Sequence, residues 1–231
     1  MSLPSDLKRE TSLLIGGALQ WFRRHWRPFV TFQILLLVAI WAGLHPYDHE
    51  LLKAVRGQPF GMVPKETLVI AGEISHWGDF PGFNVILAIT LWLAGVLFCR
   101  PRWKRLALMT VLCAAFAGIS TNVLRFGIGR SRPQVKQDGF YGPRFSNLYQ
   151  SCPSGHTTTA FAAAIPLVIA APPLGVATTL IATSVGWSRM FVNRHYPADI
   201  AMAVWMALWF ALPLGFAARV RRISDEPYTS V

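Results

Sequence analysis

The sequence predicts an all-α protein that crosses a membrane several times. Hydrophobic residues make up 53% of the 231 residues and charged residues only 14%, whereas about 25% are charged in an ordinary soluble domain. The apolar residues gather into long runs, most of which approach the roughly 20 residues that a helix needs to cross a bilayer. Clusters of basic residues flank these runs, as they do at the cytoplasmic ends of membrane helices.

Six membrane-spanning helices can be drawn from the apolar runs. The runs cover residues 28–44, 82–99, 106–124, 157–171, 173–187 and 200–218. The fourth and fifth are short for a crossing and would need the residues at their ends to complete it. Tryptophans near the ends of several runs suit the interfacial belt of a membrane protein: Trp26, Trp41, Trp103 and Trp187. We therefore expect a single six-helix membrane domain over residues 28–218.

The first 27 residues are interpreted as a cytoplasmic or interfacial segment. In a helix over residues 7–27, apolar side chains would touch lipid while Arg23, Arg24 and Arg27 face the headgroups. A simple extension of the first membrane helix explains the same pattern equally well. At the other end of the chain, residues 219–231 are expected to form a cytoplasmic tail.

The long segment between the first two runs, residues 45–81, predicts short helices on the bilayer surface. Residues 63–77 mix apolar side chains with Lys65, Glu66 and Glu73, which suits an interfacial helix better than a crossing. Glycine, proline and aspartate in residues 77–82 then predict a turn before the second run.

The charge distribution orients the helices and argues against one class of function. The net charge is +11, and basic clusters lie before the first run, between the second and third, and after the last. These three regions should face the cytoplasm, so six crossings place residues 45–81, 125–156 and 188–199 on the opposite side. Nucleic acid is not an expected partner, because basic and aromatic residues are not interleaved as in an RNA-binding sheet.

Three short motifs, each at the end of an apolar run, together predict a phosphate-transfer site. The last is Ser188-Arg189-x5-His195-x3-Asp199. Pro197 suits the first position of a helix, which puts Asp199 in the first turn, where it can reach back and accept one ring N–H of His195. The other ring nitrogen can then attack phosphorus. A capping aspartate beside an ordinary interfacial histidine is the alternative.

The middle motif is Pro153-Ser154-Gly155-His156, at the start of the fourth run. Serine is a good helix cap, glycine lets a ligand approach the backbone, and the free N–H groups of a first helical turn attract phosphate. His156 can give a proton to the leaving oxygen. A simple Pro-Ser-Gly loop is the alternative.

The first motif is Arg125-x6-Arg132-Pro133, at the end of the third run. The glycines at 127 and 129 let the chain turn back, so that both guanidinium groups can bind one phosphate bidentately. A basic loop over anionic headgroups is the alternative. Because no acidic cluster suited to Mg²⁺ accompanies the motifs, we expect neither a metal nor another cofactor.

These motifs resemble the three signatures of the type 2 phosphatidic acid phosphatase family, which also includes acid phosphatases and vanadium haloperoxidases. The family pattern is Lys-x6-Arg-Pro, Pro-Ser-Gly-His and Ser-Arg-x5-His-x3-Asp, and the second and third signatures are matched in full. In the first, Arg125 stands where the family usually has lysine, so a planar fork replaces a point charge. The resemblance extends over residues 82–218 and, through the six-helix layout, from the first run.

The resemblance implies a role for each site residue. His195 would be the nucleophile that forms a phosphohistidine, Asp199 would orient it, and His156 would act as general acid and then as base for water. Arg144 and Arg130 are further candidates for contact with the headgroup. The oxygens of the transition state would be held electrostatically by Arg125, Arg132, Ser154, Gly155 and Arg189.

The chain is similar to the bacterial membrane branch of the family, whose members remove phosphate from phosphatidylglycerophosphate, undecaprenyl diphosphate or lipid A on the periplasmic side. This implies a multi-pass protein of the inner membrane with cytoplasmic termini, a periplasmic site and a membrane lipid phosphate as substrate, phosphatidic acid included. Undecaprenyl diphosphate or a related lipid is the favoured substrate. Residues 134–152 would form a lid, in which Arg144 contacts the second phosphate. The oligomeric state is left open.

Three other functions are weighed against a lipid phosphatase. A phosphotransferase that passes the phosphate to a second lipid shares every motif, and only an acceptor-dependent assay separates it. A transporter is disfavoured because the apolar runs hold no Asp, Glu, Lys or Arg between their ends. An inactive relative is disfavoured because His156, His195 and Asp199 are all present.

Overall fold

The protein is described here by a computed structural model that covers residues 3–78, 80–135 and 137–225, and in this part of the chain every regular element is a helix. The predicted all-α fold class is confirmed. Short π or 3-10 turns occupy Ile40–Leu44, His45–Tyr47, Phe60–Met62, Phe80–Asn84 and Asn147–Tyr149. The longer helices are α1 (Leu3–Ala39), α2 (Asp48–Arg56), α3 (Lys65–Trp77), α4 (Val85–Leu97), α5 (Pro101–Ile128), α6 (Gly155–Ala170), α7 (Pro172–Phe191) and α8 (Pro197–Asp225).

Each of the six predicted runs lies largely within a helix, but fewer than six helices qualify as membrane spans by length and composition. Among the described residues three do so: Leu7–Met62, Pro101–Ile128 and Pro197–Val220. Lys65–Trp77 and Gly82–Leu97 make a fourth if they are counted as one span with a 48° bend. Helix α6 has 16 residues, a length of about 24 Å, which is shorter than the ~30 Å hydrocarbon core of a bilayer.

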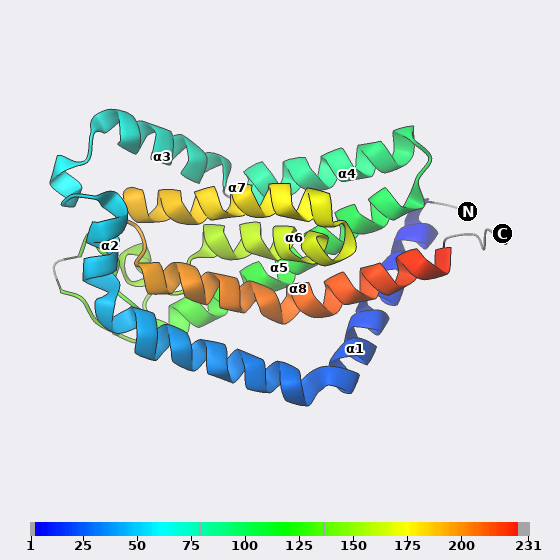
Figure 1. The fold of residues 1–231 in the computed structure, drawn as a ribbon, viewed down its shortest axis with the longest axis horizontal. Coiled ribbons are helices and arrows are strands. Elements are labelled where there is room, and N and C mark those ends of the chain that lie inside the picture. Colours follow the sequence, from blue (N-terminus) through cyan, green and yellow to red (C-terminus); the bar gives the residue numbers. More distant parts are fainter. Residues whose placement is uncertain (1–2, 79, 136, 226–231) are drawn as a thin grey trace.

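The N-terminal segment and the first apolar run form one continuous helix, α1, with no break at residue 27. Figure 1 shows this helix sharply bent. Pro28 lies inside it, and a proline is a usual cause of such a bend, because it removes one helical hydrogen bond and its ring pushes the preceding turn apart. The expected tail begins as a continuation of α8, which ends at Asp225; residues 226–231 lie outside the described part.

Two helices, α2 and α3, form in the long segment after α1, as predicted. Helix α2 has acidic residues in its first turn and basic residues in its last, which suits the helix dipole. Gly57, with φ 71°, ends it in the left-handed conformation that favours glycine. Figure 1 shows α3 leading into α4 through the bend. The predicted position of α3 on the bilayer surface stays a prediction.

Helix α6 lies at the centre of the bundle, packed against α5, α7 and α8. Small residues let these neighbours approach closely, and four alanines of α6 are completely buried: Ala160, Ala162, Ala163 and Ala164. In Figure 1 the last turns of α5 and α7 and the first turns of α6 and α8 lie together at the end of the molecule opposite the start of α1 and the end of α8. The helices therefore gather all three motifs at one end.

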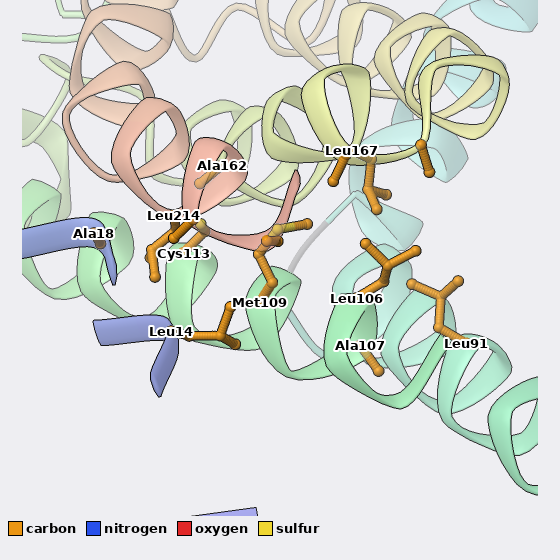
Figure 2. Close-up of a cluster of buried hydrophobic side chains, with 14 of the residues drawn as sticks. Leu14, Ala18, Leu91, Leu106, Ala107, Met109, Cys113, Ala162, Leu167 and Leu214 are labelled. Carbon is orange, nitrogen blue, oxygen red and sulfur yellow. The ribbon is translucent and has the colours of Figure 1, made fainter. Parts of the chain in front are cut away.

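The main apolar core lies between α1, α4, α5, α6 and α8 (Figure 2). In it, Leu14 of α1 packs with Met109 and Cys113 of α5, all three completely buried, and Leu214 of α8 joins them. In a bilayer such contacts hold helices together by close packing, since lipid tails are as apolar as the side chains themselves. This core fixes the helices whose far ends carry the motifs.

Candidate active site

The chain turns sharply after α5, and backbone hydrogen bonds fix the loop that follows. Gly129 takes φ 61°, a left-handed conformation that favours glycine, and a Cβ there would collide with the carbonyl group of Gly142. Three N–H groups then donate to carbonyl oxygens at 3.0, 2.9 and 3.0 Å: Ser131 to Gly139, Arg132 to Leu148 and Ser151 to Arg130. The first motif is thereby tied to the segment that leads into α6.

The predicted nucleophile, His195, is buried beside this loop. Only 1% of the residue is exposed, and its Nδ1 lies 2.7 Å from the carbonyl oxygen of Ser151. Because a carbonyl oxygen only accepts, Nδ1 carries the proton and donates it, and in the neutral ring Nε2 has the free lone pair. His195 is thus held in the tautomer that an attack through Nε2 requires.

Asp199 lies close to His195 but does not accept its hydrogen bond. Its Oδ2 is 3.7 Å from Nδ1, which is longer than a hydrogen bond, so the expected direct bond is replaced by the bond to Ser151. Oδ2 accepts instead from the Ser151 hydroxyl at 2.5 Å and from the Tyr196 N–H at 2.9 Å, while Oδ1 accepts from Arg130 Nη1 at 2.8 Å. Asp199 therefore acts on the imidazole as a nearby negative charge.

The surroundings of His195 keep its ring neutral. Burial lowers its pKa to about 3, and the positive charges of Arg189 and Arg132 act in the same direction against the opposing effect of Asp199. Since the pKa is depressed, the ring takes up a proton only as the pH falls through about 3, and at neutral pH its lone pair is available.

A neutral His195 can be detected in solution. In ¹⁵N NMR spectra of histidine-labelled protein in detergent, we expect one ring to keep the neutral Nδ1–H signature at pH 5, where an ordinary histidine, with a pKa of about 6.5, is protonated. The signal should be missing from His195→Ala. If the signal that His195→Ala removes titrates near pH 6.5, the buried neutral ring is wrong.

Several arginines gather around the imidazole. Arg132 is 8% exposed, and its burial, together with the positive charges of Arg194 and Arg125, lowers its pKa to about 10. These positive charges repel one another, and an anion bound among them would reduce the repulsion. Arg189 is equally buried and donates a hydrogen bond to the hydroxyl of Ser75 in α3.

The middle motif opens α6 and meets the first motif there. Ser154, completely buried, is the N-cap residue, and its N–H donates to the carbonyl oxygen of Asp199 at 3.2 Å. A Cβ on Gly155 would stand 3.2 Å from Nη1 of Arg125, so the missing side chain makes room for that guanidinium beside the helix N-terminus. An anion placed there would meet both the helix N–H groups and the arginine. His156, the next residue, is partly exposed.

The two candidates for headgroup contact lie in different surroundings. Arg144 is exposed, and its guanidinium lies over the rings of Tyr141 and Tyr149 at 5.2 and 4.9 Å from their centroids. Arg130 is completely buried, and its guanidinium forms ion pairs with two buried carboxylates. Both of its terminal nitrogens are engaged by Asp48 and Asp199, so the expected contact of Arg130 with a headgroup would have to replace one of these ion pairs.

Sequence reasoning missed two residues that contact the site. Asp48, in the first turn of α2, is 1% exposed and accepts a hydrogen bond from Arg130. In the sequence it reads as an acidic residue at the start of an exposed helix, and nothing in the local pattern marks it as buried. Ser151 holds His195 through its main-chain carbonyl, a contact that no residue type specifies.

The sequence is similar to known proteins. Residues 106–221 match the model of the PAP2 superfamily. Lipid A 1-phosphatases of Rhizobium johnstonii and Rhizobium etli are each 38% identical over 103 residues, which cover 42% of this chain and 41% and 44% of those relatives. The chain thus matches less than half the length of these curated relatives.

Two solved structures have a similar fold. One is a transmembrane PAP2-type phosphatidylglycerolphosphate phosphatase from Bacillus subtilis, with a TM-score of 0.58 and 21% identity over 87% of this chain and 97% of that one. The other is Aquifex aeolicus LpxE, with a TM-score of 0.52 and 16% identity over 72% of this chain and 93% of that one. Because the matched family model covers half of the chain and includes all three motifs, this chain belongs to the PAP2 superfamily.

Proposed function

We propose that this protein is a membrane lipid phosphatase that works through a phosphohistidine intermediate on His195. The observation that carries the proposal is the hydrogen bond from Nδ1 to the Ser151 carbonyl oxygen, because it leaves Nε2 with a free lone pair. The charges of Arg132 and Arg189 act on the same ring and would hold the phosphate against it.

In the first step, the lone pair of Nε2 attacks phosphorus and the bond between phosphorus and the lipid oxygen breaks. His156 gives its proton to that leaving oxygen. The arginines and the N–H groups at the start of α6 stabilise the charge on the phosphoryl oxygens. The phosphorylated imidazole gains positive charge, which the carboxylate of Asp199, 3.7 Å from Nδ1, stabilises.

In the second step, water attacks phosphorus and the bond to nitrogen breaks. His156, now neutral, takes a proton from the attacking water and so returns to its starting state. The products are inorganic phosphate, the dephosphorylated lipid and neutral His195. The reaction therefore consumes only lipid phosphate and water.

A phosphate of lipid A is the substrate that we propose first. Support comes from the two curated relatives, both named lipid A 1-phosphatase. Undecaprenyl diphosphate, favoured from the sequence, is the second candidate, followed by phosphatidylglycerophosphate and phosphatidic acid. Transfer of the phosphate to a second lipid uses the same site and would differ only in the acceptor.

We also propose six crossings of a bacterial inner membrane, with both termini in the cytoplasm and the site on the periplasmic side. Support comes from the basic clusters at the ends of the apolar runs and from the gathering of the motifs at the end away from the start of α1 and the end of α8 (Figure 1). The membrane domain would cover residues 28–218. A lid formed by residues 134–152 agrees with the exposed Phe145 and Arg144 in that segment.

The first test is phosphate release from a lipid panel in detergent. The panel holds lipid A, undecaprenyl diphosphate, phosphatidylglycerophosphate and phosphatidic acid, and EDTA is present because the proposed steps use no metal ion. We expect the wild-type protein to release phosphate from at least one lipid and lipid A to be the best substrate.

Two results would contradict the proposal. Activity that EDTA abolishes and Mg²⁺ restores would show that a metal ion takes part. No release from any lipid, followed by transfer when an acceptor lipid is added, would replace hydrolysis by phosphotransfer.

A further inference from the structure

We propose that Asp48 is a positioning residue for the nucleophile, acting through Arg130 and Asp199 on His195. Its expected effect on kcat rests on the proposed function. Its expected effect on anion binding rests on the geometry alone. Asp48 belongs to none of the three motifs and comes from helix α2, far from them in the sequence. It would extend the site to a part of the chain outside the matched family region.

Asp48 contacts two separate parts of the site. The residue is 1% exposed. Its Oδ2 accepts a hydrogen bond from Arg130 Nη2 at 2.7 Å and lies 3.2 Å from His45 Nδ1. Its Oδ1 accepts the backbone N–H of Ala198 at 2.8 Å. One carboxylate thereby binds the loop after α5 and the first turn of α8 at the same time.

Arg130 connects Asp48 to Asp199. Its guanidinium joins two carboxylates, Asp48 through Nη2 and Asp199 through Nη1, and the three groups are almost fully buried. The ring of Tyr196 covers the guanidinium, with 4.3 Å from Cζ to the ring centroid. Buried charges of this kind are held in one geometry, because any displacement leaves a charge without its partner.

Both supports of the nucleophile depend on where Asp199 lies. Its Oδ2 accepts from the N–H of Tyr196, the residue next to His195, and from the hydroxyl of Ser151, whose carbonyl holds Nδ1. A shift of Asp199 would therefore move the imidazole and its acceptor together. Because attack on phosphorus needs a near-linear approach, a small error in direction costs rate more than it costs binding.

Two ligands separate positioning from simple support of the fold. Orthovanadate would form a bond to Nε2 of His195, whereas inorganic phosphate would be held by the arginines without such a bond. For the full chain in detergent, Asp48→Asn is expected to weaken orthovanadate binding and to lower kcat on the best lipid, each by ~10-fold or more, and to leave phosphate binding and KM unchanged. Asp48→Glu, which keeps a carboxylate for Arg130, should recover part of the loss.

Glu50→Gln is the matched control, since it removes the same charge from an exposed position on α2, and it should bind both anions like the wild type. Thermal unfolding of each variant accompanies the binding measurements. A double variant, Asp48→Asn with Arg130→Gln, should bind orthovanadate no more weakly than Arg130→Gln alone, because the two residues act in series.

Unchanged orthovanadate binding in Asp48→Asn would overturn the inference, as would an equal loss for orthovanadate and phosphate. Losses that multiply in the double variant would also overturn it. If the wild type releases no phosphate from any lipid but the orthovanadate result holds, the proposed function fails and the positioning role stands. A wild type that does not bind orthovanadate would overturn both.

Discussion

His195→Ala is expected to lower phosphate release from the best lipid substrate by ~10⁴-fold or more, the scale seen when an enzyme loses its nucleophile. The loss should lie in kcat, because the arginines and the first turn of α6, which are proposed to hold the phosphate, are left in place.

The covalent intermediate gives this prediction a direct readout. Acid-labile, base-stable label from a ³²P-lipid should appear on the wild-type protein after rapid quenching and be absent from His195→Ala. Because a buried side chain is removed, His195→Gln and thermal unfolding serve as controls for folding. Label on the folded His195→Ala protein, or activity within tenfold of the wild type, would mean that another residue attacks phosphorus.

His156→Gln is expected to show a loss that depends on the leaving group. With a lipid alkoxide, which needs a proton to depart, kcat/KM should fall by ~10³-fold, within the range of a lost general acid. With p-nitrophenyl phosphate, whose leaving group departs without a proton, kcat/KM should fall far less. The second step still lacks its base, so the phosphoenzyme should accumulate and release of nitrophenol should show a burst.

A histidine remote from the chemistry provides the comparison. His25 lies on α1, and its Nδ1 is bonded within the helix to the carbonyl oxygen of Trp21 at 2.9 Å. His25→Gln should leave both substrates unaffected. If His156→Gln loses the same factor with both leaving groups and shows no burst, His156 does not transfer the proton.

The motifs predicted most of the site because their chemistry is local. A proline followed by an aspartate two residues later predicts a helix start, and α8 does begin at Pro197 with Asp199 in its first turn. The glycines at 127 and 129 predicted a turn, and the turn forms at Gly129 with its left-handed φ, whereas Gly127 lies inside α5. Residue type and spacing do not show which acceptor a histidine N–H will find. Asp199 was expected to accept the hydrogen bond of His195, and the carbonyl oxygen of Ser151 accepts it instead.

The contacts that the sequence could not predict join segments far apart in the chain. Arg130, a basic residue that follows Gly129 at the end of an apolar run, was a candidate for contact with the headgroup. Its burial depends on Asp48, 82 positions away, and neither residue alone indicates the pair. The sequence also predicted six crossings, whereas three helices of the described residues qualify as spans, or four with the bent pair, and α6 with its 16 residues is short for a span.

The acceptor that fixes the protonation of His195 belongs to the main chain at position 151. A substitution there exchanges the side chain and leaves the carbonyl oxygen where it was. The tautomer of His195 is therefore set by the main chain and not by the type of side chain at position 151. This tautomer does not require a carboxylate acceptor, whereas the position of the His195 ring still depends on the contacts of Asp199 with Ser151 and Tyr196.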